Sequence, residues 1–119
     1  MSARPWEGRR IHLIGIGGAG MSGWARVAAQ LGATVSGSDQ AGGPAVDHLR
    51  ALGIAVAVGH AAENVPDGAE LFHSTAIPDD NPERTIPGRP SRPRADLLAE
   101  LTAMAKVIAI AGAHGKTPT

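Results

Sequence analysis

The stretch RIHLIGIGGAG at residues 10–20 constrains the fold most strongly, because a short aliphatic run leads directly into closely spaced glycines. The run at 10–16 predicts a β-strand, and Gly15, Gly17 and Gly20 match the G-x-G-x-x-G pattern of dinucleotide-binding folds. Glycines in such a turn permit a sharp bend, close approach of the backbone to a diphosphate, and tight packing of the next helix. Amide groups at the start of that helix then face the anion.

The rest of the chain repeats this order of strand and helix. Apolar residues recur at helical spacing over 19–31 and 42–53, and each of these segments closes on a glycine. Such a repeat favours right-handed crossovers and a parallel sheet. We therefore expect an α/β fold, a Rossmann-like parallel β-sheet with helices on both faces. The further strands predicted from aliphatic segments are 33–39, 54–60 and 69–75.

Prolines interrupt the pattern over residues 78–93, which we interpret as a loop with one turn after Asn81. Helical spacing of apolar residues returns at Arg94, and the aliphatic run at 106–112 predicts a last strand. The helical face predicted between them consists of Leu97, Leu98, Leu101 and Met104.

The composition argues against several classes of protein. The 119 residues suffice for one domain, and 11 basic side chains balance 11 acidic ones, so no polybasic surface for nucleic acid is expected. No apolar run approaches the roughly 20 residues that cross a bilayer, so no membrane partner is expected. The chain has no cysteine, which fits an intracellular protein, and no His or carboxylate group shows metal-ligand spacing.

The first glycine turn leaves the identity of its diphosphate open. Asp39 lies 19 residues beyond Gly20, at the end of the second predicted strand, where it can accept hydrogen bonds from sugar hydroxyls. NAD, FAD and UDP-sugars all contain a diphosphate, and the pattern alone favours NAD. An NAD(P)-binding regulatory or dehydrogenase domain therefore remains an alternative. A structural module whose glycines serve only a tight turn is a second one.

A second glycine segment, GAHGKT at residues 112–117, follows the last predicted strand. The standard pattern G-x-x-x-x-G-K-[ST] fails, because Ile110 occupies its first position. The shortened form G-x-x-G-K-T still offers backbone amides for phosphates, the ammonium of Lys116, and the Thr117 hydroxyl for Mg²⁺. A basic tail without bound nucleotide is the alternative interpretation.

Taken together, the two glycine segments resemble a known family. The stretch HLIGIGGAGMSGWARVAAQLGATVSGSD at 12–39 is similar to the start of the Mur ligases, most of all to the UDP-N-acetylmuramate–L-alanine ligases. The similarity continues through HSTAIPDDNPE at 73–83 and RADLLAEL at 94–101, and it closes on IAIAGAHGKT. It covers nearly all of residues 10–117.

The resemblance implies a cytoplasmic enzyme of peptidoglycan precursor synthesis. It would use ATP and Mg²⁺ to join L-alanine to UDP-N-acetylmuramate, through an acyl phosphate that the amino group attacks. The implied domains are a UDP-sugar-binding domain at 1–105 and, at 106–119, the first strand and phosphate loop of an ATP-binding domain. We expect no ligation by this chain alone, and the sequence does not indicate its oligomeric state.

The resemblance also implies which residues bind. The diphosphate would meet the glycine turn, the uridine would lie by the end of the second strand, and residues after the third and fourth strands would line the same cleft. The implied UDP-sugar residues are Gly15, Gly17, Gly18, Ala19, Gly20, Met21, Ser38, Asp39, His60, Ser74, Thr75 and Ala76. The implied ATP residues are Gly112, His114, Gly115, Lys116 and Thr117, with Thr117 also the Mg²⁺ ligand.

Three features depart from the family pattern. Ala113 and Pro118 stand where the family usually has threonine, so one hydroxyl and one backbone donor are lost near the γ-phosphate. Residues 84–93 are shorter than the family's helix and strand and are rich in proline, which argues against a fifth strand there. Outside the motifs, His12 alternates with aliphatic residues and is expected to be structural, whereas His73 is a further candidate for the cleft.

Overall fold

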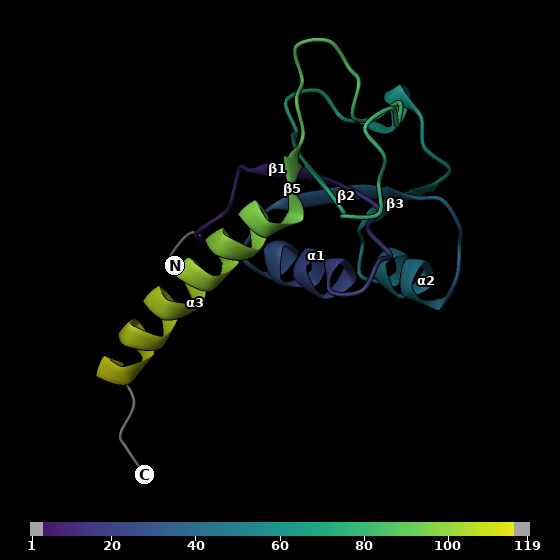
Figure 1. The fold of residues 1–119 in the computed structure, drawn as a ribbon. Helices are drawn as coiled ribbons and strands as arrows, with labels where there is room; N and C mark the ends of the chain where they lie inside the picture. Colours follow the sequence, from purple (N-terminus) through teal and green to yellow (C-terminus); the bar gives the residue numbers. More distant parts are fainter. Residues whose placement is uncertain (1–3, 116–119) are drawn as a thin grey trace.

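The computed structural model describes residues 4–115, with only the backbone described for residues 107–115. Within this range a parallel sheet has the strand order β3-β2-β1-β4-β5 (Figure 1). The predicted α/β fold with a parallel sheet is confirmed. The strands are β1 (Arg10–Ile14), β2 (Thr34–Asp39), β3 (Ala55–Val58), β4 (Glu70–His73) and β5 (Arg92–Pro93).

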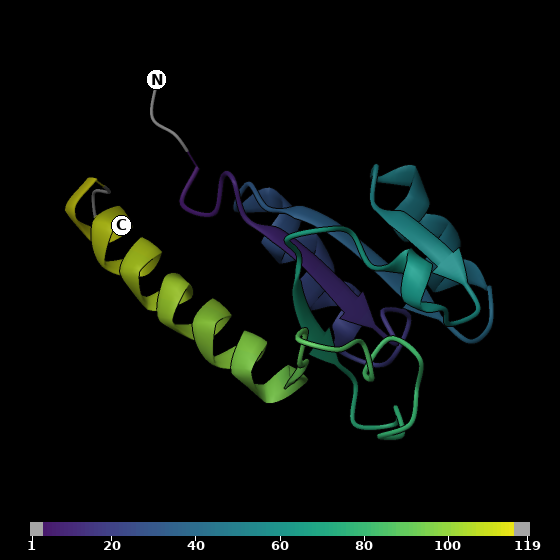
Figure 2. The same cartoon turned by 90° about the horizontal axis from the view of Figure 1, so that it is seen from above.

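Three α-helices pack on one face of this sheet (Figures 1 and 2). Helix α1 (Met21–Gln30) connects β1 to β2, and α2 (Pro44–Ala51) connects β2 to β3. Both crossovers advance the chain in the same direction across the sheet, so right-handed connections place both helices on the same side. Helix α3 (Arg94–Gly115) follows β5 and contacts α1 and β4. Buried side chains from all three helices join the strands in one apolar core.

The other face of the sheet is covered by loops, which corrects the expectation of helices on both faces. The connection from β3 to β4 contains only the short 3₁₀-helix η1 (Ala62–Asn64). The connection from β4 to β5 contains prolines, which remove backbone donors and prevent a helix. Side chains of β1 alternate between the two faces, so Ile11 and Leu13 meet the helices whereas His12 points toward the loops.

The loop over 78–93 has the predicted turn after Asn81, where the Arg84 amide donates to the Asn81 carbonyl at 2.8 Å. The argument against a fifth strand was wrong, since β5 pairs in parallel with β4 and aligns Arg92 with Phe72. This strand has two residues and lies at the edge of the sheet. An edge strand tolerates a proline because its outer side requires no amide donor, which explains how Pro93 is accommodated.

The strand predicted at 106–112 was also wrong, because α3 continues through these residues to Gly115. A helix satisfies its backbone hydrogen bonds within the segment, whereas a strand needs a neighbouring strand, and the described residues place none beside it. Figure 2 shows α3 leaving the edge of the sheet and running outward.

Charged side chains tie the start of α3 to the sheet. The Arg9 guanidinium donates to both oxygens of Glu70 at 2.8 and 2.6 Å, and to Glu100 of α3 at 2.9 Å. Arg92 donates to Glu70 at 3.2 Å and lies over the ring of Phe72. The hydrogen bonds from Arg9 hold the pKa of Glu70 below its ordinary value. Among the described residues, no helix has the length and hydropathy required to cross a membrane.

Candidate functional site

The glycine turn after β1 forms the centre of the candidate site. Gly15 has a φ of +85°, which L side chains rarely adopt, and a Cβ added there would lie 2.9 Å from the Cβ of Ser74. The turn closes on itself, since the Gly18 amide donates to the Gly15 carbonyl and the Met21 amide donates to the Gly18 carbonyl. Among the described residues, the amides of Ala19 and Gly20 donate to no protein group.

Asp39 links this turn to the end of β2. Its Oδ2 accepts a hydrogen bond from the Gly17 amide at 2.8 Å, and its Oδ1 accepts one from the Ala41 amide at 3.2 Å. A Cβ on Gly17 would lie 2.8 Å from that same Oδ2, so the close approach of the carboxylate requires glycine. Asp39 therefore stabilises the glycine turn through these hydrogen bonds, besides the sugar contact expected from the sequence.

A cleft opens beside the turn, at the carboxyl ends of β1, β2 and β4. It consists of two adjoining cavities of about 340 and about 150 Å³. This edge of a parallel sheet, where neighbouring connections depart in opposite directions, is where such folds bind ligands. The residues that line both cavities are Gln40, His60, Ala76 and Ile77, and the smaller one also reaches Gly15, Gly18, Asp39 and Ser74.

The structure thus brings together six of the residues expected to contact the UDP-sugar: Gly15, Gly18, Asp39, His60, Ser74 and Ala76. Three other expected residues do not line the cleft. The Met21 side chain is fully buried in the core, Ser38 is fully buried beneath the cleft, and Thr75 is exposed. Ala19 and Gly20 are exposed in the turn.

The expected ATP residues are not arranged as a phosphate loop within the described residues. Gly112, His114 and Gly115 lie in the backbone of α3, where amides are committed to carbonyls of the preceding turn. Lys116 and Thr117, the expected partners of phosphate and Mg²⁺, lie outside the described residues. Elsewhere in the described chain, no three His, Asp or Glu side chains gather as a metal site.

Glu83 is the residue of this region that sequence reasoning missed. Its side chain is fully buried, and its carboxylate accepts hydrogen bonds from several separate segments. Oε1 accepts from His12 Nε2 of β1 at 2.6 Å and from Ser38 Oγ of β2 at 2.8 Å. Oε2 accepts from the Ala61 amide and from Asn64 Nδ2 of η1, both at 3.0 Å. One carboxylate therefore holds together the segments beneath the cleft.

The charge of Glu83 is stabilised by these donors. Burial by itself would raise the pKa, but the hydrogen bonds from His12, Asn64, Ser38 and Ala61 outweigh it and lower the pKa to about 2. Glu83 is therefore an ionised acceptor at neutral pH. Every buried side-chain nitrogen and oxygen of the described residues has a hydrogen-bond partner.

One signal in the sequence could have indicated such a partner. His12 is fully buried, and its bonds to Glu83 and Ser36 confirm the structural role that its alternation with aliphatic residues predicted. A histidine placed inside a strand requires a polar partner. No local pattern pairs His12 with Glu83, which lies in a loop without periodicity and 71 residues away. His73 lies outside the cleft and bonds Ser91 Oγ at 2.7 Å.

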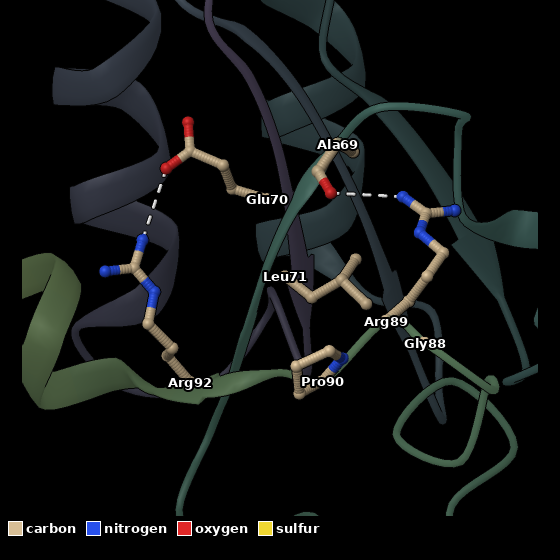
Figure 3. Close-up of a pocket in the computed structure, with 7 residues that line it drawn as sticks. All are labelled: Ala69, Glu70, Leu71, Gly88, Arg89, Pro90 and Arg92. Atoms are coloured by element: carbon tan, nitrogen blue, oxygen red, sulfur yellow. Dashed lines mark hydrogen bonds and ion pairs between the residues drawn. The ribbon is translucent and has the colours of Figure 1, made fainter.

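A further cavity of about 350 Å³ lies at the amino end of β4, whereas the cleft lies at its carboxyl end (Figure 3). Its two arginines have protein partners. Arg89 donates to the Ala69 and Pro66 carbonyls at 3.0 and 2.8 Å, and Arg92 donates to Glu70. These bonds fasten the proline-rich loop to β4, so this cavity is a structural junction.

Comparison with known proteins shows the family of this chain. The sequence pattern described as "Mur ligase family, catalytic domain" matches residues 10–106. The chain belongs to the Mur ligase family. Its sequence is 54% identical over 115 residues to a UDP-N-acetylmuramate–L-alanine ligase of Aromatoleum aromaticum, covering 93% of this chain and 24% of that relative. A second such ligase, from Oleidesulfovibrio alaskensis, is 52% identical over 113 residues, covering 92% of this chain and 25% of the relative.

A solved structure extends the similarity to the fold. The UDP-N-acetylmuramate–alanine ligase of Thermotoga maritima superposes with a TM-score of 0.74 at 33% identity, over 80% of this chain and 23% of that protein. The chain therefore spans about a quarter of the length of these relatives.

Proposed function

We propose that this chain binds UDP-N-acetylmuramate in the cleft beside the glycine turn. The observation that supports this most directly is the cleft itself, which joins the glycine turn to the carboxyl ends of three parallel strands. The relatives that share about half of its residues are named as ligases of that sugar nucleotide. Binding would supply the recognition step of such a ligase.

The diphosphate would lie against the glycine turn. The amides of Ala19 and Gly20 are available for its oxygens at the start of α1, where the helix dipole favours an anion. A guanidinium is also present, because Arg94 donates to the Ala19 carbonyl at 3.0 Å and lies over the ring of Trp24. Arginine near this turn would add charge-assisted hydrogen bonds to phosphate.

The uridine would extend from the turn toward Asp39 and His60, in the cavity that Ser74 and Ala76 also line. Asp39 ends β2, His60 follows β3, and Ser74 and Ala76 follow β4, so the sheet fixes their relative positions. In this arrangement the chain would bind and orient a sugar nucleotide.

The wider activity follows from the family and is part of the same proposal. The whole enzyme would be a cytoplasmic ligase that uses ATP and Mg²⁺ to join L-alanine to the muramate carboxylate, in peptidoglycan precursor synthesis. In this scheme residues 1–105 form the UDP-sugar domain, and 106–119 begin the ATP-binding domain. We expect no ligation by the chain alone.

Titration of the ¹⁵N-labelled chain with UDP-N-acetylmuramate, and separately with NAD, tests the binding proposal. We expect the amide signals of Ala19, Gly20 and Asp39 to shift with the sugar nucleotide and to stay unchanged with an equal concentration of NAD. Arg94→Gln provides the matched comparison, and loss of one charged contact should weaken binding by roughly 10-fold. Shifts with NAD alone would contradict the proposal.

A further inference from the structure

The buried carboxylate of Glu83 determines which way a chain of hydrogen bonds points beneath the cleft. An ionised carboxylate has no hydrogen to donate, so both groups at its Oε1 must be donors. The hydroxyl of Ser38 therefore uses its single hydrogen on Glu83, at 2.8 Å. That hydroxyl can then only accept from its next neighbour.

The next neighbour of Ser38 is His60. Its Nδ1 lies 2.9 Å from Ser38 Oγ and 3.5 Å from Glu83 Oε2. Because the Ser38 hydrogen is already engaged, Nδ1 of His60 must be the donor. Neutral His60 therefore has its hydrogen on Nδ1, and its Nε2 has a free lone pair.

The Nε2 atom of His60 faces the cleft. Within the described part of the chain, every buried side-chain nitrogen has a hydrogen-bond partner. The Nε2 atom of His60 has none. Nε2 must therefore reach the surface, and the His60 ring lines both cavities. The side chain is only 12% exposed, so little more than this edge of the ring is accessible.

We infer that Glu83 is a positioning residue for ligand recognition: through Ser38 it fixes neutral His60 with a hydrogen on Nδ1, so that Nε2 accepts a hydrogen bond from an N–H or O–H group of the ligand. This inference rests on the proposed binding of a UDP-sugar in the cleft. Two groups of such a ligand fit the chemistry, namely the imide N–H of uracil and a ribose hydroxyl. Glu83 itself lies beneath the surface and touches no ligand.

Replacing Glu83 with glutamine should reverse the chain of hydrogen bonds. The Ala61 amide can only donate, so the carbonyl oxygen of a glutamine at position 83 must occupy the site of Oε2. Its NH₂ group then faces Ser38 and donates to the hydroxyl. The Ser38 hydrogen must turn toward Nδ1 of His60, and the ring hydrogen of His60 moves to Nε2.

The decisive measurement is the tautomer of His60, read from long-range ¹H–¹⁵N spectra of the histidine rings at mildly alkaline pH. We expect the Nδ1–H form in the 119-residue chain and the Nε2–H form in Glu83→Gln. Ser36→Ala is the matched control, because Ser36 bonds Nδ1 of His12, whereas the hydrogen-bond partners of Ser38 are His60 and Glu83. His60 should keep the Nδ1–H form in this control.

A second variant covers the case in which Glu83→Gln fails to fold. Ser38→Ala removes the hydroxyl but keeps the carboxylate, which lies 3.5 Å from Nδ1, so the Nδ1–H form should persist. An Nε2–H form of His60 in the unmodified chain would overturn the inference, whatever the variants do. An unchanged tautomer in folded Glu83→Gln would overturn it as well, and so would an equal change in Ser36→Ala.

Ligand titrations then identify the group that His60 recognises. Glu83→Gln should weaken binding of UDP by about 10-fold or more, because a ligand donor would meet the Nε2–H group of His60. If the donor is the imide, CDP should bind the unmodified chain more weakly than UDP does, and the variant should lose this preference. If the donor is a ribose hydroxyl, either 2′-deoxy-UDP or 3′-deoxy-UDP should show the loss instead.

A result with neither preference would overturn the assignment of a ligand donor to Nε2. Because the tautomer is read without ligand, it separates this inference from the proposed function. Absence of all UDP-sugar binding would contradict the proposed function while the tautomer still reports on Glu83.

Discussion

The two faces of the sheet are built from the same strands but are held by different interactions. On the helix face, apolar side chains such as Ile11, Leu13 and Leu97 form a continuous core. On the loop face, His12 and Ser38 are equally buried, and they are bonded to the single carboxylate of Glu83. The apolar face distributes its stability over many contacts, whereas the polar face concentrates it in one residue.

This difference has consequences for how each face responds to a change. Apolar contacts are non-directional, so neighbouring side chains can shift to reduce a cavity. Hydrogen bonds in a buried network are directional, and a donor that loses its acceptor retains the full cost of its desolvation. We therefore expect the loop face to be the more sensitive of the two to a single substitution.

The largest effect is expected for Glu83→Ala. The change leaves the buried donors of His12 and Ser38, and the half-buried donor of Asn64, without this acceptor, and should lower the free energy of unfolding by about 3–5 kcal/mol. Urea denaturation followed by circular dichroism measures this loss. Glu63→Ala is the matched control, because Glu63 is an exposed glutamate of η1, and it should change stability by less than about 0.5 kcal/mol. Equal losses of unfolding free energy in the two variants would contradict the view that the loop face depends on Glu83.

The second prediction concerns pH and the same face. The pKa of Glu83 is lowered from 4.5 to about 2 in the folded chain, so the folded state binds fewer protons than the unfolded state between these values. Its contribution is complete above pH 4.5 and is lost as the pH falls through about 2. A shift of this size corresponds to roughly 3 kcal/mol.

Acid denaturation of the unmodified chain alone cannot assign this loss, since the pKa of Glu70 is also lowered. The measurement is therefore the difference in stability between the unmodified chain and Glu83→Gln, followed from neutral to acid pH. The difference in stability should narrow as the pH falls from 4.5 to about 2, because Glu83 is protonated in this range and glutamine does not titrate. A constant difference would show that the charge of Glu83 does not stabilise the loop face.

The same contrast explains what the sequence could predict. The strands and helices that build the apolar core could be predicted from the spacing of their apolar residues. Ile11 and Leu13 alternate as in a strand, and Leu97 belongs to a helical repeat. The glycine turn and Asp39 could be placed at the cleft from a local pattern. The partnership of His12 and Glu83 joins residues 71 positions apart, one of them in a loop, so no local pattern contains it.

Two errors have a related cause. The strand expected at 106–112 was inferred from aliphatic residues, but a strand forms only where a neighbouring strand pairs with it, and a helix needs no such partner. Conversely, β5 forms from a proline-rich segment because the edge of β4 is available to Arg92. In both places the neighbouring backbone decided the outcome, and local composition did not.

The smallest effect should come from the helix face, and Leu97→Ala tests it. Leu97 is fully buried between α3 and the core, so removing most of its side chain should cost about 2–3 kcal/mol. This is the lower part of the usual range, because α3 lies at the edge of the sheet and can move inward to reduce the cavity. Urea denaturation gives the loss.

Leu98→Ala, one residue along the same helix, is the matched control for that measurement. The Leu98 side chain is 40% exposed, so its removal should cost less than about 1 kcal/mol. A loss for Leu97→Ala as large as that for Glu83→Ala would remove the contrast between the faces, since the apolar core would then adjust no better than the polar network. A loss close to that of Leu98→Ala would show that α3 does not depend on its apolar contact with the sheet.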